Sequence, residues 1–191
     1  MRRIDIPDFI KGLIFDCDGT LVDSMPLHLK AWEHVILSQG GLWASDFFIS
    51  VSGMPEADIV VLYNQQFGQA LDPVETIVAK HTFFRSHASE FKPIRHVLDV
   101  VRRYHLSLPM AVVSGGVRDI VELELDALGI KDCFETILTA DDDIKPKPAP
   151  DIFLAAARRL AVPPERCQVF EDGELGLEGA RLAGMLATDV R

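Results

Sequence analysis

Residues 13–20, Leu-Ile-Phe-Asp-Cys-Asp-Gly-Thr, decide the fold of this chain. The apolar run 13–15 ends abruptly at a carboxylate, and a second carboxylate follows two positions later, so that Asp16 and Asp18 flank one residue. Because successive residues of an extended segment point to opposite sides, these two carboxylates point to the same side. A short run that is apolar on both faces is typical of a strand buried in a parallel sheet. The stretch therefore predicts a buried strand with two carboxylates at its carboxyl end.

Four further short apolar runs along the chain also predict buried strands. They lie at Met110–Val113, Thr136–Leu138, Gln168–Phe170 and, near the C-terminus, Met185–Ala187. Helical patterns separate them, at residues 117–128, 150–160 and 174–183. Strands that alternate with helices predict an α/β fold with a Rossmann-like, doubly wound parallel sheet.

The segment between the first two predicted strands breaks this alternation and has an all-helical pattern. Helix starts are indicated at Pro26, Pro55, the Asp72–Glu75 capping box and Pro93, and stops at Gly40-Gly41 and Gly68. We therefore expect a small all-helical domain, residues 24–90, inserted into a discontinuous α/β core domain made of residues 1–23 and 91–191.

Composition and net charge indicate the number of domains and the class of partner. The chain has 191 residues, which is the size of one domain with a modest insertion, and 48% of them are hydrophobic. It carries 19 Lys and Arg against 29 Asp and Glu, a net charge of -10. Proteins that bind nucleic acid usually carry a basic surplus, because phosphate neutralisation supplies much of their affinity. The acidic balance disfavours a nucleic-acid partner.

Cysteine use and the N-terminal sequence predict the compartment. The three cysteines are odd in number and show no CxxC spacing, so we expect reduced thiols rather than disulfides or a zinc cluster. Asp5, Asp8 and Lys11 interrupt any apolar stretch near the N-terminus. We therefore predict a cytoplasmic protein with no signal peptide and no membrane partner.

Polar side chains follow each of the main predicted strands at the point where the strand ends. They are Asp16 and Asp18, then Ser114, then the Asp141–Lys147 region, then Glu171 and Asp172. Ligands of open α/β sheets bind at this carboxyl edge. Four carboxylates in one place repel one another unless a cation lies among them. Oxygen ligands suit Mg²⁺, and Mg²⁺ together with basic side chains suits a phosphate group.

In chain order these residues resemble the four motifs of the haloacid dehalogenase-like (HAD) hydrolase superfamily. The stretch Asp16–Thr20 resembles its DxDGT motif, and Ser114-Gly115-Gly116 resembles the second motif. The stretch Lys145–Asp151 resembles the third, with Lys147 as the aligned lysine and Lys145 as the alternative. Phe170–Asp172 resembles the fourth. The resemblance covers nearly the whole chain and is specific in these core motifs.

The resemblance implies a two-step phosphoryl transfer. Asp16 attacks phosphorus to form an aspartyl-phosphate, and Asp18 protonates the leaving alcohol and then activates water. The resemblance also implies that Asp16, the Asp18 backbone carbonyl and Asp172 hold Mg²⁺, with Glu171 as a weaker candidate ligand, either directly or through water. The phosphate contacts implied by the resemblance are Ser114, Gly115, Lys147 and Thr20; for Thr20, support of the loop is an equal alternative.

Two glycine features accompany these motifs. Gly173 stands where the family often has Ser, which removes one possible hydrogen bond but leaves the predicted metal site intact. Gly173, Gly176 and Gly179 lie three residues apart and do not form GxGxxG. We interpret them as sites of close helix packing, not as a dinucleotide-binding motif.

The inserted segment resembles the small helical cap of one branch of this superfamily. That branch contains β-phosphoglucomutase, phosphonoacetaldehyde hydrolase and sugar-phosphate phosphatases; the start of the segment is most similar to fructose-1-phosphate or 6-phosphogluconate phosphatases. The resemblance makes His28 a candidate substrate contact, and a helix-surface position is its alternative. Residues 42–79 contain no Lys, Arg or His, which disfavours the second phosphate site that a mutase needs.

The prediction is a monomeric Mg²⁺-dependent phosphatase of small sugar phosphates, whose partner is a small phosphorylated metabolite. Two alternatives stay open at this point. One is a β-phosphoglucomutase-type mutase. The other, of a different class, is a catalytically inactive HAD-like binding protein.

Overall fold

A computed structural model describes residues 4–191 and contains a five-stranded sheet. Its strands are β1 (Gly12–Phe15), β2 (Met110–Val113), β3 (Thr136–Leu138), β4 (Cys167–Glu171) and β5 (Leu186–Asp189). All neighbours pair in parallel, in the order β3-β2-β1-β4-β5. The predicted parallel sheet is confirmed, and the strand bounds differ from the predicted ones by two residues at most.

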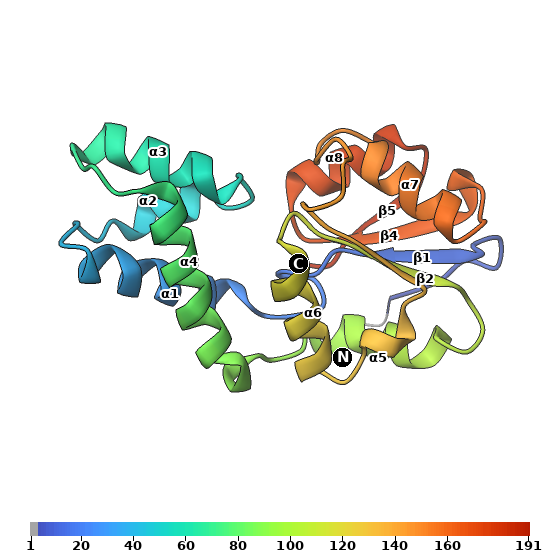
Figure 1. Cartoon of the computed structure of the whole chain (residues 1–191). Coiled ribbons are helices and arrows are strands. Elements are labelled where there is room, and N and C mark those ends of the chain that lie inside the picture. The colour runs from blue at the N-terminus through green and yellow to red at the C-terminus, as the bar shows by residue number, and fades with distance from the viewer. Residues whose placement is uncertain (1–3) are drawn as a thin grey trace. The chain divides into compact units, whose positions relative to one another are not determined.

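Helices cover both faces of this sheet. Figure 1 shows α7 (Asp151–Arg159) and α8 (Glu174–Leu182) on one side, and α5 (Arg95–Tyr104) and α6 (Arg118–Ala127) on the other. Two 3₁₀ turns, η2 (Lys131–Cys133) and η3 (Pro164–Arg166), lead into β3 and β4. The arrangement confirms the predicted Rossmann-like, doubly wound α/β fold.

Strand burial explains why the central runs are apolar on both faces. Every residue of β1, β2 and β4 is buried, whereas the edge strands β3 and β5 are partly exposed. In the register, Phe15 of β1 pairs with Val112 on one side and Phe170 on the other. The Phe15 and Phe170 rings stack with centroids 4.5 Å apart. This register aligns the carboxyl ends of three neighbouring strands.

The chain divides into two compact units. The α/β unit joins the segment up to Asp23 with Lys92–Arg191, and the helical unit is Ser24–Phe91. The two segments of the α/β unit that lead to and from the helical unit, residues 21–23 and 92–94, lie side by side. The Asp23 amide donates to the Lys92 carbonyl (2.8 Å), and the Ile94 amide donates to the Leu21 carbonyl (3.0 Å).

The helical unit contains α1 (Met25–Ser38), α2 (Ser45–Ser50), α3 (Glu56–Phe67), α4 (Pro73–Ser86) and the 3₁₀ turn η1 (Ala88–Glu90). The predicted cap of α4 is confirmed, since an Asp72 oxygen accepts the Glu75 amide at 2.9 Å. Gly68 ends α3 in the left-handed region at φ +64°. The short helix α2 was not predicted.

Aromatic side chains form the core of the helical unit. Phe47 and Phe48 are buried among Trp32 and Tyr63. The Tyr63 hydroxyl donates to the Leu42 carbonyl at 2.7 Å and accepts the Leu42 amide at 2.8 Å.

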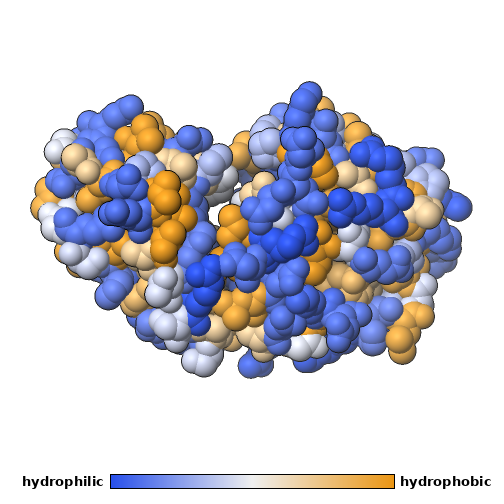
Figure 2. Space-filling view, viewed as in Figure 1, coloured by the Kyte–Doolittle hydropathy of each residue, from blue (hydrophilic) through white to orange (hydrophobic). Residues whose placement is uncertain are grey.

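Figure 2 shows apolar residues among hydrophilic ones on the surface of this unit; its exposed apolar side chains include Leu42, Val74 and Val78. In residues 4–191, no helix combines the length and apolar character needed to cross a bilayer.

A buried ion-pair cluster joins α1, α3 and α4 in this unit. Lys80 is 1% exposed and contacts Glu56 and His28 Nδ1, the latter at 2.8 Å. His81 Nε2 lies 2.7 Å from the other Glu56 oxygen. Burial alone raises the pKa of Glu56, but the hydrogen bond from His81 and the charge of Lys80 outweigh burial and lower that pKa to about 2.

We expect Glu56→Gln to destabilise the protein at pH 7 by roughly 3 kcal/mol, the free energy that corresponds to the pKa shift. The folded-state pKa lies below the unfolded value, so the stabilisation is present above the unfolded pKa and is lost as pH falls through the folded pKa. The difference between variant and wild type should therefore shrink from about pH 5 to about pH 2. Urea unfolding at several pH values measures it.

Asp58→Asn is the matched control, because Asp58 lies in the same helix and is exposed. It should change the free energy of unfolding by less than about 1 kcal/mol. A Glu56→Gln effect that is independent of pH would contradict the ion-pair explanation.

Candidate active site

The loop after β1 turns tightly and brings both predicted catalytic carboxylates to the sheet edge. The Cys17 carbonyl accepts the amides of Thr20, Leu21 and Val22 at 3.2, 2.9 and 3.1 Å. Gly19 has φ +78°, a conformation that favours glycine, and a Cβ there would overlap the Asp172 carboxylate. The turn therefore depends on glycine both for its backbone angle and for the close approach of Asp172.

The ammonium group of Lys147 contacts residues at the ends of three strands. Lys147 Nζ donates to Asp16 Oδ1 at 2.7 Å, directly after β1, and to the Val113 carbonyl at 3.3 Å, at the end of β2. It also pairs with Glu171, the last residue of β4. Lys145, the predicted alternative, is exposed. The structure thus places Lys147 rather than Lys145 beside the predicted nucleophile.

Three carboxylates meet at this edge. Oxygens of Asp16, Glu171 and Asp172 all lie within 4.8 Å of one another. Burial raises the pKa of Asp16 well above its usual value, and the charges of Glu171 and Asp172 add to this despite the opposing charge of Lys147. Burial and the charge of Glu171 also raise the pKa of Asp172.

The same carboxylates raise the pKa of Lys147. Burial by itself lowers that pKa, but the negative charges of Asp16 and Glu171 outweigh burial. The site therefore holds one protonated lysine among three carboxyl groups. The raised pKa values of Asp16 and Asp172 mean that ionisation of these two groups is unfavourable here. A cation bound by these oxygens would stabilise the charged carboxylates, so the set of ligands fits a divalent metal such as Mg²⁺.

Thr20 and Glu171 hold the loops around the cluster. The Thr20 hydroxyl donates to Asp172 Oδ1 at 3.1 Å, which corresponds to the loop-supporting role considered for this residue. The second Glu171 oxygen accepts the Gly173 amide at 2.9 Å. A Cβ at Gly176 would overlap the Glu171 carboxylate, and one at Gly179 would lie 2.9 Å from the Phe153 ring. This confirms close packing as the reason for Gly176 and Gly179.

The loop after β2 supplies the predicted phosphate-binding hydroxyl. Ser114 is buried and its Oγ accepts the Gly116 amide at 2.9 Å. Gly115 is exposed, with open space beside its Cα. A Cβ at Gly116 would lie 3.3 Å from Ser114 Oγ and 3.6 Å from Asp18 Oδ2, so both polar groups border this glycine. The hydroxyl and the second carboxylate therefore lie near one another.

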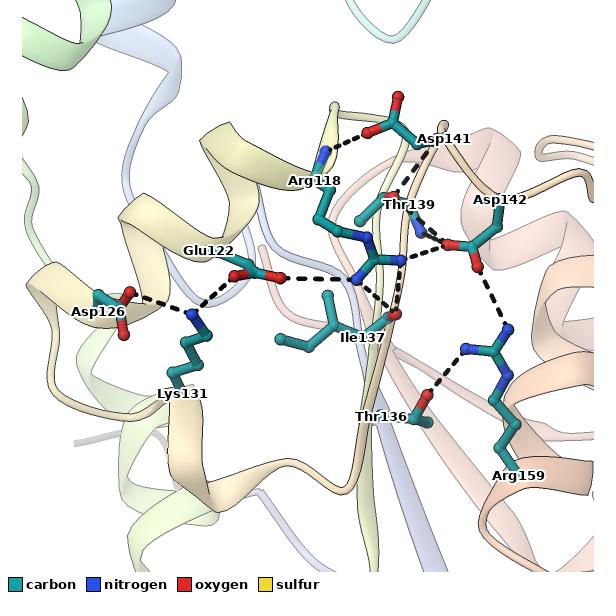
Figure 3. A network of polar contacts seen from close by, with 10 residues as sticks. All are labelled: Arg118, Glu122, Asp126, Lys131, Thr136, Ile137, Thr139, Asp141, Asp142 and Arg159. Atoms are coloured by element: carbon teal, nitrogen blue, oxygen red, sulfur yellow. Dashed lines mark hydrogen bonds and ion pairs between the residues drawn. The ribbon is translucent and has the colours of Figure 1, made fainter.

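A polar network fixes the loop that leads from β3 to Lys147 (Figure 3). Asp142 Oδ2 accepts the Thr139 amide at 2.9 Å and Arg118 Nη2 at 2.8 Å, and its Oδ1 accepts Arg159 Nη2 at 3.2 Å. The Arg118 backbone amide donates to Asp141 at 2.7 Å. Arg118 is thus engaged in holding this loop to α6, and Asp142 joins α6 to α7.

Two further residues are His28, a predicted substrate contact, and Glu124, for which no role was predicted from the sequence. His28 belongs to the helical unit, where it contacts Lys80 and stacks on Phe84 with centroids 4.3 Å apart. Glu124 of α6 was not predicted: it is fully buried, and the Cys17 thiol donates to its Oε2 at 3.2 Å. Burial, followed by the charge of Glu124, raises the pKa of Cys17, so this thiol keeps its proton.

Comparisons with known proteins agree with this geometry. A family model described as haloacid dehalogenase-like hydrolase matches residues 10–184. The fructose-1-phosphate phosphatase YqaB of Escherichia coli is 39% identical over 94% of this chain and 96% of its own length. A phosphorylated carbohydrates phosphatase of Thermotoga maritima is 29% identical over 92% of this chain and 82% of its own.

A solved structure supports the fold. The crystal structure of CbbY from Rhodobacter sphaeroides in complex with phosphate aligns with a TM-score of 0.81 at 24% identity. The alignment covers 93% of this chain and 84% of that one.

Proposed function

Since the chain belongs to the haloacid dehalogenase-like hydrolases, we propose that it is a Mg²⁺-dependent phosphatase of small sugar phosphates. The observation that carries the proposal is the meeting of Asp16, Lys147, Glu171 and Asp172 at the carboxyl edge of the sheet. A carboxylate nucleophile beside a lysine and two further carboxylates fits phosphoryl transfer, in which catalysis is mainly positioning and charge stabilisation. The phosphatase names of two relatives agree with it.

In the first step, an Asp16 oxygen attacks the substrate phosphorus, the bond to the sugar oxygen breaks, and an aspartyl-phosphate forms. Lys147 holds Asp16 Oδ1 in place and offsets the negative charge that collects there. Ser114 donates its hydroxyl to a phosphoryl oxygen, with the Gly115 amide beside it. Asp18 gives its proton to the departing sugar oxygen.

In the second step, Asp18 takes a proton from water, the water oxygen attacks phosphorus, and the Asp16 carboxylate is released with inorganic phosphate. Asp16, the Asp18 carbonyl and Asp172 would hold Mg²⁺, and Glu171 stays paired with Lys147. When bound, the ion lowers the repulsion between the anionic nucleophile and the anionic phosphate. Thr20 keeps Asp172 against the loop.

We assign the helical unit the role of the cap that selects the sugar, with His28 as its candidate substrate contact. Charge favours a phosphatase over a mutase, because residues 42–79 supply no basic side chain. Lys80, the nearest cation that follows them, is buried and paired with Glu56. A mutase must bind a second phosphate, and a lysine already neutralised by a carboxylate is a poor anchor for it.

We expect the protein to release phosphate from fructose 1-phosphate and from p-nitrophenyl phosphate with added Mg²⁺, and to lose this activity when EDTA is in excess. With β-glucose 1-phosphate, free phosphate should appear and glucose 6-phosphate should not. Coupled assays for both products measure the ratio. Glucose 6-phosphate as the main product would favour the mutase, and a folded protein without turnover on any phosphate ester would favour an inactive binding protein. A monomeric state, a cytoplasmic location and the lack of nucleic-acid or membrane partners stay predictions.

A further inference from the structure

A carboxyl group lies on the apolar face of α6. The buried side of this helix is formed by positions 120, 121, 124 and 125, of which three carry Ile, Val and Leu. The fourth is Glu124, which is fully buried. Burial of a carboxyl group in an apolar setting costs several kcal/mol unless specific partners satisfy it. An apolar residue would match the other three positions of this face, so burial of the face does not explain the glutamate.

One partner of Glu124 is Cys17, the residue between the two catalytic aspartates. The Cys17 thiol donates to its Oε2 at 3.2 Å, and Cys17 is itself fully buried. The carbonyl of the same Cys17 accepts the three amides that close the loop. A Glu124 oxygen also lies within 4.8 Å of an Asp18 oxygen. The Glu124 carboxyl group therefore accepts from Cys17, whose carbonyl closes the loop, and it lies next to Asp18, which transfers the proton in the proposed mechanism.

We propose that Glu124 is a positioning residue for the phosphatase reaction, and that it acts through Cys17 to hold the Asp16–Thr20 loop with Asp18 in line with the leaving oxygen. This inference rests on the proposed function. The aspartate carboxylates must lie within hydrogen-bond reach of the atoms they serve, and misplacement by about 1 Å costs on the order of 10²-fold in rate. Asp16 is held from the other side, since its carboxylate accepts from Lys147 and its amide donates to the Phe170 carbonyl of β4. Cys17 and Glu124 supply the anchor to α6.

The test is a comparison of two substrates with Glu124→Leu, Glu124→Gln, Cys17→Ala and Cys17→Ser. A sugar phosphate has a poor leaving group that needs the proton from Asp18, whereas p-nitrophenyl phosphate has a good one that does not. We expect Glu124→Leu and Cys17→Ala to lower kcat/KM, which reports on the first phosphoryl transfer, on fructose 1-phosphate by roughly 10- to 100-fold and on p-nitrophenyl phosphate by less than about threefold.

The conservative variants separate positioning from packing. Glu124→Gln keeps an oxygen that can accept from Cys17, and Cys17→Ser keeps a donor, so each should recover most of the lost rate. Asp18→Asn gives the reference pattern for loss of the proton donor. Thermal unfolding of Glu124→Leu should show a stability equal to or above that of the wild type, because an apolar side chain replaces a buried carboxyl group.

The outcomes distinguish the two proposals. If the wild type hydrolyses sugar phosphates and Glu124→Leu keeps the wild-type rate on both substrates, the positioning role is wrong while the phosphatase stands. Equal losses on both substrates with a lower unfolding temperature, and no recovery in Glu124→Gln, would show a purely structural residue. A folded wild type that hydrolyses neither ester overturns the proposed function and the positioning role with it.

Discussion

Asp16→Asn should lower phosphatase turnover by a factor on the order of 10⁴ or more, because an amide oxygen cannot serve as the attacking nucleophile. The fold should survive. Asn has the size of Asp, and its oxygen can still accept a hydrogen bond from Lys147, which lies 2.7 Å from Asp16 Oδ1. The change also removes one of three crowded carboxylates, and this crowding is, after burial itself, the reason that the pKa of Asp16 is raised. We therefore expect an unfolding temperature no lower than that of the wild type.

Steady-state assays on fructose 1-phosphate measure the loss, and circular dichroism with thermal unfolding checks the fold. Asp132→Asn is the matched control, since Asp132 is exposed on η2, away from the site, and the variant should keep the wild-type rate. Acid quenching during turnover should leave labelled phosphate on wild-type protein and none on Asp16→Asn. Label retained by the variant, or full activity in it, would remove Asp16 from the nucleophile role.

The sheet and its carboxyl edge were predictable from the sequence because the runs that form β1, β2 and β4 are buried on both faces. Such strands show no alternation, and the residue that stops each run is polar. The predicted run Met185–Ala187 begins one residue before β5 begins and ends two residues before β5 ends, since an edge strand is partly exposed and its pattern is weaker. Helix α2 was missed because six residues without a side-chain cap carry little periodic signal; it forms because Phe47 and Phe48 pack into the helical core.

Pairings between distant residues were the part that the sequence did not reveal. The motif pattern selected Lys147, but its contacts with Glu171 and Val113 depend on how three strands align. The pair formed by a glutamate of α3 and a lysine of α4 joins two helices and has no local signature. Glu124 had a usable signal, because it follows Ile120 by four positions and Val121 by three, and this spacing places it on the apolar face of the predicted helix.

A second large effect is expected at Lys147. Lys147→Met should lower turnover by roughly 10²- to 10³-fold, the range found when one charge-stabilising donor is removed from an active site. The physical reason is that this ammonium lies against both Asp16 and Glu171 and supplies positive charge to both. Methionine has a similar length and no charge, so the substitution removes the charge with little change of volume.

Lys145→Met is the matched control: the residue is two positions away in the same loop, exposed, and should keep the wild-type rate. The same pair of variants separates the two lysines that fit the third motif. Lys147→Met should also be less stable, because it leaves Asp16 and Glu171 buried without their cation; breaking a buried pair costs about 3–5 kcal/mol. Added Mg²⁺ should recover part of that stability by supplying positive charge, and urea unfolding with and without Mg²⁺ measures this. Loss of turnover in Lys145→Met with none in Lys147→Met would exchange the two roles.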